Sequence, residues 1–217
     1  MLSVILGAAG SPHSSYAADQ NSTLDSQGNY ANSALGIYFQ APAGWTVEEP
    51  KKSDASAPDV AVIAPYSSGF TASISITVDQ ANGTSLADYV KNKEQRLLAG
   101  NQSASISFLS EQDSTVGGLP AKTSLLEETF PSHSGNSTIR FEETAVLAND
   151  KIYTLTYAND KGNFASDLPN YEQVLSSVKF GNAGSVVFDT LPMGIVAAAL
   201  AGGGLIVYRS RRRKNNS

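Results

Sequence analysis

The stretch FTASISITV, residues 70–78, has the clearest hydrophobic period in the chain. Its apolar residues alternate strictly with serine and threonine, which predicts a strand with one buried and one polar face. The apolar set is Phe70, Ala72, Ile74, Ile76 and Val78. The rest of the chain can be interpreted outward from this strand.

Extended segments lie on both sides of it. The segment that starts at Gly36 is stopped by Pro42, and a second extended piece begins at Trp45. Farther along, Asn149 and Asp150 form a two-residue turn that tolerates the left-handed conformation, so the segments beside it should pair as a hairpin. About seven strands are expected, at residues 36–42, 60–63, 70–78, 105–109, 122–129, 138–147 and 151–157.

Two helices complete the predicted fold. Residues 85–99 have an apolar stripe, with Ser85 as the N-cap and Asp88 three residues later as an acidic variant of the capping box. Residues 168–178 form the second helix, capped by Asp167. Because strands do not alternate with helices, we expect an α+β fold in which a mostly antiparallel sheet packs its apolar face against the helices.

An uncharged segment, LPMGIVAAALAGGGLIVY, follows near the end of the chain at residues 191–208. As a helix it would be about 27 Å long, close to a hydrocarbon core of ~30 Å. Positive charge near the end of a membrane helix stays in the cytoplasm. The basic tail after residue 208 should therefore be cytoplasmic, and the residues before the helix should lie outside. The alternative is that residues 191–208 form a buried core helix, but such a helix would not need a cluster of positive charges at its end. The predicted anchor runs from Leu191 to Tyr208 and is followed by Arg209, Arg211, Arg212 and Arg213.

These segments predict a single-pass protein of the cell membrane with an extracytoplasmic N-terminal domain. The apolar run near the start and the small residues after it predict a signal peptide, and the polar stretch that follows predicts a disordered leader. Leu191 and Pro192 also resemble a sorting signal that would be cleaved, although Gly194 stands where threonine is expected. The predicted order is signal peptide 1–18, leader 19–34, domain 35–181, linker 182–190, transmembrane helix 191–208 and basic tail 209–217.

Charge and composition exclude several functions. All 20 acidic residues and only ten of the 15 basic residues precede the anchor, so this part carries a net charge of −10. An acidic domain argues against nucleic acid as a partner. The chain has no cysteine, and His133 is the one histidine outside the predicted signal peptide. Neither a zinc hydrolase site nor a Ser/His/Asp triad can be built from these residues.

Two kinds of site remain as candidates. The first is a calcium site with oxygen ligands, because one glutamate from each of two paired strands could meet on one face of the sheet. The alternative is that the glutamates of these strands lie on a solvent-exposed face, where Lys122 and Arg140 balance their negative charge. The candidate ligands are Glu127, Glu128, Glu142 and Glu143. The second kind is N-glycosylation, at the motifs that begin with Asn21, Asn82, Asn101 and Asn136.

Four local patterns, in order, resemble the PsbP-like family. They are FQAPAGW at residues 39–45, GGLPA at 117–121, YTLTY at 153–157, and the closing helix with Phe164, Tyr171 and Phe180. The resemblance covers residues 35–181 and implies an α-β-α sandwich around an antiparallel sheet. With its C-terminal anchor, the layout resembles archaeal members. The family's best-known members are extrinsic subunits of photosystem II that help retain calcium and chloride, but the leader here has no motif matching the segment they use.

The resemblance implies a non-catalytic domain held at an extracytoplasmic membrane face. We therefore expect a non-enzymatic protein, without a cofactor, that binds a protein partner or supports a membrane or surface complex. An accessory calcium-type module and an unrecognised hydrolase are the alternatives.

Overall fold

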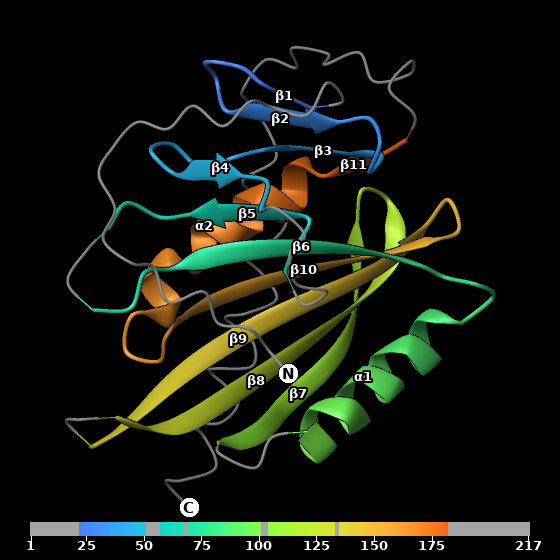
Figure 1. Cartoon of the computed structure of the whole chain (residues 1–217). Coiled ribbons are helices and arrows are strands. Elements are labelled where there is room, and N and C mark those ends of the chain that lie inside the picture. Colours follow the sequence, from blue (N-terminus) through green and yellow to red (C-terminus); the bar gives the residue numbers. More distant parts are fainter. Residues whose placement is uncertain (1–21, 51–56, 67–68, 101–103, 133–134, 182–217) are drawn as a thin grey trace, which may run out of the picture. The chain divides into compact units, whose positions relative to one another are not determined.

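The computed structural model describes residues 22–50, 57–66, 69–100, 104–132 and 135–181 (Figure 1). Every pair of neighbouring strands in this part of the chain is antiparallel, which confirms the α+β class. The helices are α1 (Leu86–Gly100) and α2 (Phe164–Ser177). The strands are β1 (Ser22–Leu24), β2 (Asn29–Asn32), β3 (Ile37–Gln40), β4 (Thr46–Glu48), β5 (Val60–Ile63), β6 (Ser73–Gln80), β7 (Ser105–Val116), β8 (Leu119–Ser132), β9 (Gly135–Ala148), β10 (Lys151–Asp160) and β11 (Lys179–Phe180).

The strands form two sheets. The larger sheet has the order β4-β5-β6-β10-β9-β8-β7, and the smaller one has the order β1-β2-β3-β11. The small sheet corrects the predicted leader, because residues 22–24 and 29–32 are strands and not disordered chain. Tyr30 is only 3% exposed and its ring lies 4.9 Å from that of Phe39. Strands β1 and β2 are too short to show a hydrophobic period, so they could not be predicted from the sequence.

The strand predicted from the alternating stretch is β6, but it begins at Ser73. Ile74 and Ile76 are completely buried in the main core, as expected. Phe70 is the exception, because it lies before the strand and packs against a separate, smaller cluster.

The two helices differ in how well the sequence predicted their starts. In α1, the N–H of Asp88 donates to the Ser85 hydroxyl (3.1 Å), and that hydroxyl donates to the Asp88 carboxylate (2.6 Å), which confirms the capping pair. In α2, Asn163 is the N-cap, so the prediction of Asp167 is wrong. Asp167 lies in the first turn and accepts a hydrogen bond from Asn159 (3.0 Å).

The helices cover opposite faces of the larger sheet. Tyr171 and Val174 of α2 belong to the main core together with Leu155 of β10 and Phe39 of β3. On the other face, Leu97 of α1 packs against a small cluster with Leu126 and Phe141. The sheet is therefore a layer between α1 on one side and α2 with the small sheet on the other, as Figure 1 shows.

The chain divides into a unit of residues 1–185 and a second unit of residues 186–217. Within the described part of the chain, no helix has the length and apolar character that crossing a membrane requires. The predicted signal peptide, linker, transmembrane helix and basic tail lie outside the described residues.

Candidate functional site

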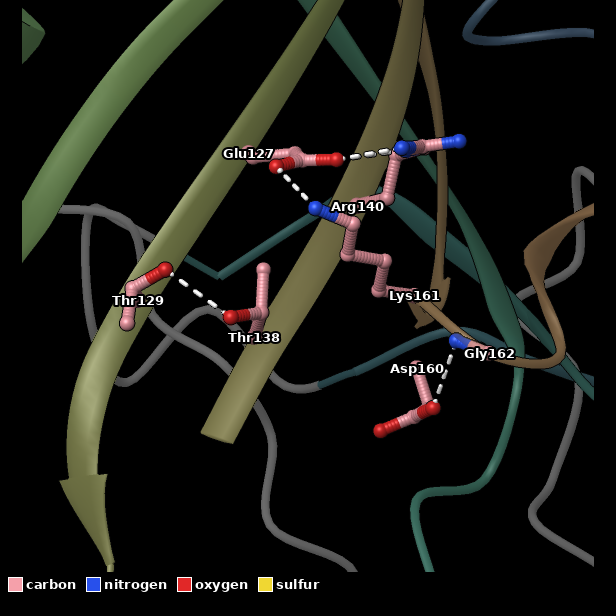
Figure 2. A network of polar contacts seen from close by, with 7 residues as sticks. All are labelled: Glu127, Thr129, Thr138, Arg140, Asp160, Lys161 and Gly162. Carbon is pink, nitrogen blue, oxygen red and sulfur yellow. Dashed lines mark hydrogen bonds and ion pairs between the residues drawn. The ribbon is translucent and has the colours of Figure 1, made fainter. Parts of the chain in front are cut away.

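Glu127 of β8 lies at the centre of an ion-pair cluster (Figure 2). Arg140, directly opposite on β9, donates to its carboxylate through Nε (2.9 Å) and through a guanidinium nitrogen, and Lys161 Nζ lies 2.9 Å from its other oxygen. Hydrogen bonds from Arg140, and then from Lys161, hold the pKa of Glu127 below its usual range. The carboxylate is therefore ionised and neutralised within the fold.

The same cluster ties the β10–α2 turn to the middle strands. The Thr129 and Thr138 hydroxyls are hydrogen bonded across β8 and β9 (2.9 Å), and the Gly162 N–H donates to Asp160 (2.8 Å) in the turn that carries Lys161. Arg140 also lies over the Phe164 ring, 5.5 Å from its centroid. This arrangement holds the start of α2 against the sheet.

Glu143 lies on the opposite face of the sheet, under α1. Lys93 of α1 donates to its carboxylate (2.6 Å), and the Thr156 hydroxyl lies 3.4 Å away. Its side chain is only 10% exposed. Glu143 is therefore the sheet end of a buried contact that fixes α1.

A second polar contact fixes α1 one turn earlier. The Tyr89 hydroxyl donates to Asp79 of β6 (2.8 Å) and lies 3.2 Å from the Thr154 hydroxyl of β10. Burial raises the pKa of Tyr89, so the phenol stays protonated and remains a donor. Both contacts hold the helix in place against the sheet.

Glu142 differs from the other three glutamates. Glu142 pairs with Leu125, and Glu127 pairs with Arg140, which is two positions away along the β8–β9 ladder. The two glutamates therefore lie on the same face of the sheet. Burial, and then the charge of Glu172 on α2, raises the pKa of this carboxyl. The sheet thus holds two neighbouring carboxyls whose pKa values are shifted in opposite directions.

The structure does not gather the four candidate calcium ligands. Glu127 and Glu142 lie on one face, whereas Glu128 and Glu143 lie on the other, separated along the ladder by the Leu126–Phe141 pair. Within the described ranges there is no group of three or more acidic or histidine side chains that could hold a metal ion. A calcium ion at Glu127 or Glu143 would have to displace an arginine or lysine, so the calcium site stays a prediction.

The cleft between α1 and the sheet is small. Its cavity volume is about 20 Å³, and one buried water needs ~10–15 Å³. It has room for little more than one water molecule. Its lining includes Leu97, Ile106, Leu126, Phe141, Glu128 and Glu143.

Sequence reasoning missed the length of β7. The prediction ended this strand at residue 109, but the strand runs to Val116. The register shifts between Phe108 and Ser110, so Leu109 is an extra residue at a bulge and breaks the alternation. The Gly117-Gly118 turn was the available signal, since a tight hairpin turn implies that the strand continues up to it.

Opposite effects are expected from the same substitution at Glu127 and Glu142. Glu127→Gln should destabilise the domain at pH 7, because the lowered pKa contributes stability above the unfolded value of ~4.3. That deficit should vanish as the pH falls through the lowered folded pKa. Glu142→Gln should stabilise at pH 7 and lose its advantage between the raised folded pKa and ~4.3. Urea unfolding from pH 3 to 8 checks both, and a deficit of equal sign in the two variants contradicts the assignment.

The chain has an α+β fold similar to that of PsbP. No protein-family model matches it, and no curated protein matches it in sequence. Among solved structures, it is similar to cyanobacterial PsbP (CyanoP) from Synechocystis sp. PCC 6803, with a TM-score of 0.55 and 15% identity over 81% of this chain and 98% of that chain. The resemblance seen in the sequence is thereby confirmed for the fold.

Two further solved structures are similar at lower scores. The Ran-binding protein Mog1p of Saccharomyces cerevisiae has a TM-score of 0.47 and 11% identity over 69% of this chain and 92% of that chain. LpqN of Mycobacterium tuberculosis, which is involved in cell envelope biogenesis, has a TM-score of 0.48 and 11% identity over 67% of this chain and 83% of that chain. At these identities the comparisons establish the fold alone.

Proposed function

We propose that the chain is a non-enzymatic protein-binding domain held at the extracytoplasmic face of a membrane. The observation that carries the proposal is the outer edge of β7. Among the described strands β7, which has twelve residues, pairs with β8 alone, and most of its side chains are exposed. Figure 1 shows no other labelled strand along this side of β7.

A free edge strand presents a row of backbone N–H and C=O groups that can pair with an extended segment of another protein. The first half of β7, residues 105–110, contains no charged side chain that would repel such a segment. The charged half is held against its own sheet, because Lys122 of β8 lies 3.0 Å from Glu111 and 2.9 Å from Asp113. Among the described strands, this edge thus lacks both a second partner and the charge with which proteins commonly block pairing.

The bulge adds a side-chain contact to this edge. In a regular strand, successive side chains point to opposite faces of the sheet. Leu109 interrupts this alternation because it is the extra residue of the bulge, and its side chain is 46% exposed. A partner segment would therefore pair on either side of the bulge and cover Leu109. The partner implied is an extended, largely uncharged segment with an apolar residue opposite Leu109.

Site-specific photo-crosslinking in native membranes tests the binding surface. A photoreactive side chain at Leu109 should give one discrete adduct, whereas the same group at Leu98, which is 55% exposed on α1, should give none. The adduct at residue 109 should disappear in a Ser110→Lys background, since an edge lysine opposes strand addition. Equal adducts at both positions, or an adduct that survives Ser110→Lys, would contradict the edge as the binding surface.

The membrane location can be tested separately because the chain has no cysteine. Gln95→Cys places a thiol at an exposed position of α1, and Ser217→Cys places one in the predicted tail. A membrane-impermeant maleimide applied to intact cells should label residue 95 and should label residue 217 only after permeabilisation. The reverse pattern would place the domain in the cytoplasm and contradict this part of the proposal.

A further inference from the structure

Two of the four N-glycosylation motifs lie among the described residues, in different local structures. Asn82-Gly83-Thr84 forms the turn between β6 and α1. Asn136-Ser137-Thr138 lies within β9, where Asn136 faces Pro131 of β8. The two motifs have the same residue pattern, so any difference between them as acceptors of a glycan comes from the fold.

The motif at Asn82 is presented to solvent. Asn82 and Gly83 are exposed and have φ values of 48° and 76°, and the Thr84 N–H donates to the Ala81 carbonyl (2.8 Å), which closes the turn. A side-chain carbon built at Gly83 would meet no atom within 4 Å. A bulky group on Asn82 therefore has open space beside it, and the backbone bends so that the ends of the motif lie near each other.

The motif at Asn136 is held in the sheet. Its threonine, Thr138, is half-buried, as Thr84 is, but the Thr138 hydroxyl is hydrogen bonded to that of Thr129 (2.9 Å), as Figure 2 shows. That hydroxyl is the group an N-glycosylating enzyme must read in the acceptor motif. To expose it, the end of the β8–β9 ladder would have to open.

We propose that Asn82 is N-glycosylated on the folded domain and that Asn136 is not. In this reaction the Asn82 amide nitrogen bonds to the anomeric carbon of a sugar carried by a lipid phosphate donor. The bond between that carbon and the phosphate oxygen breaks, the lipid phosphate leaves with the bonding electrons, and the amide nitrogen loses a proton to a base. The proposal rests on the extracytoplasmic location in the proposed function, because transfer from such donors occurs on that side.

A glycan at this position is compatible with binding at β7. Asn82 follows β6, and β6 is separated from β7 by β10, β9 and β8. Four strand spacings of ~4.8 Å place the two strands roughly 19 Å apart. The modification would therefore cover the β6–α1 end of the domain and leave the free edge accessible.

Peptide mass spectrometry of the full-length protein, purified from its own cell membranes, tests the assignment. The peptide containing Asn82 should carry a glycan mass, and the peptide containing Asn136 should have its unmodified mass. Thr84→Ala should abolish the glycan, whereas the matched variant Thr84→Ser should keep it, because either hydroxyl completes the motif. The turn hydrogen bond uses the backbone of residue 84, so both variants should fold.

The outcomes separate this inference from the proposed function. An unmodified Asn82 in a protein whose residue 95 is labelled from outside would overturn the glycosylation and leave the membrane location intact. An unmodified Asn82 with labelling only after permeabilisation would overturn both. A glycan on Asn136 as well as Asn82 would show that transfer precedes folding and would overturn the selection by the folded turn.

Discussion

Replacing Tyr171 by alanine is expected to lower the free energy of unfolding by about 4 kcal/mol. Tyr171 is 0% exposed and lies in α2, where its ring stacks 5.7 Å from that of Tyr157 of β10. Its hydroxyl donates to the Leu155 carbonyl (2.9 Å). The substitution therefore removes a ring and a hydrogen bond together from the contact between α2 and the larger sheet.

Equilibrium urea unfolding of residues 19–185, followed by circular dichroism, measures this loss. Tyr171→Phe is the matched control, because it keeps the ring and removes only the hydroxyl, for a cost of about 1 kcal/mol. If the alanine variant lost no more stability than the phenylalanine variant, the Tyr171 ring would not be packed between α2 and the larger sheet as the structure has it.

The sequence predicted best the elements whose signals are local. Ile74 and Ile76 alternate with serine because one face of β6 is covered and the other is not, and a period of two expresses this directly. The β9–β10 hairpin was equally clear, since Asn149 and Asp150 adopt φ values of 50° and 58° that few other residues tolerate. These features depend on residues within one strand or one turn.

The small sheet could not be predicted in the same way. Its strand β11 contains two residues, Lys179 and Phe180, and pairs with β3 about 140 residues earlier in the chain. A strand was predicted at residues 36–42, which contain β3, but β11 has too few residues to show a period. Their pairing exists because α2 returns the chain to the start of the domain, which is a consequence of tertiary packing.

The glutamates show the same limit at the candidate site. The sequence indicates that adjacent residues on a strand face opposite ways, and this holds for Glu142 and Glu143. It also suggested Arg140 as a balancing charge, and Arg140 does pair with Glu127. It did not indicate Lys93, because that lysine reaches Glu143 only once α1 has packed across the sheet.

Replacing Gly117 by alanine is expected to destabilise the domain by about 3 kcal/mol. Gly117 has a φ of 59° in the β7–β8 turn, and a side-chain carbon there would lie 3.1 Å from the Val178 carbonyl oxygen and 3.2 Å from the Phe180 ring. Left-handed strain accounts for ~1–2 kcal/mol, and the forced shift of the chain after α2 accounts for the rest. Urea unfolding of the same fragment provides the measurement.

The neighbouring glycine separates these two causes. Gly118 has a φ of 78°, but a side-chain carbon there would meet nothing within 4 Å. Gly118→Ala should therefore cost only the conformational strain, about 1 kcal/mol.

Equal losses of stability at Gly117 and Gly118 would mean that the Val178–Phe180 segment moves to accommodate the new methyl group. A larger loss at Gly117 requires that this segment be fixed, because only a fixed neighbour makes the close contact costly. The hairpin that carries β7 would then be anchored to the small sheet through β11, and the free edge would be a rigid feature of the domain.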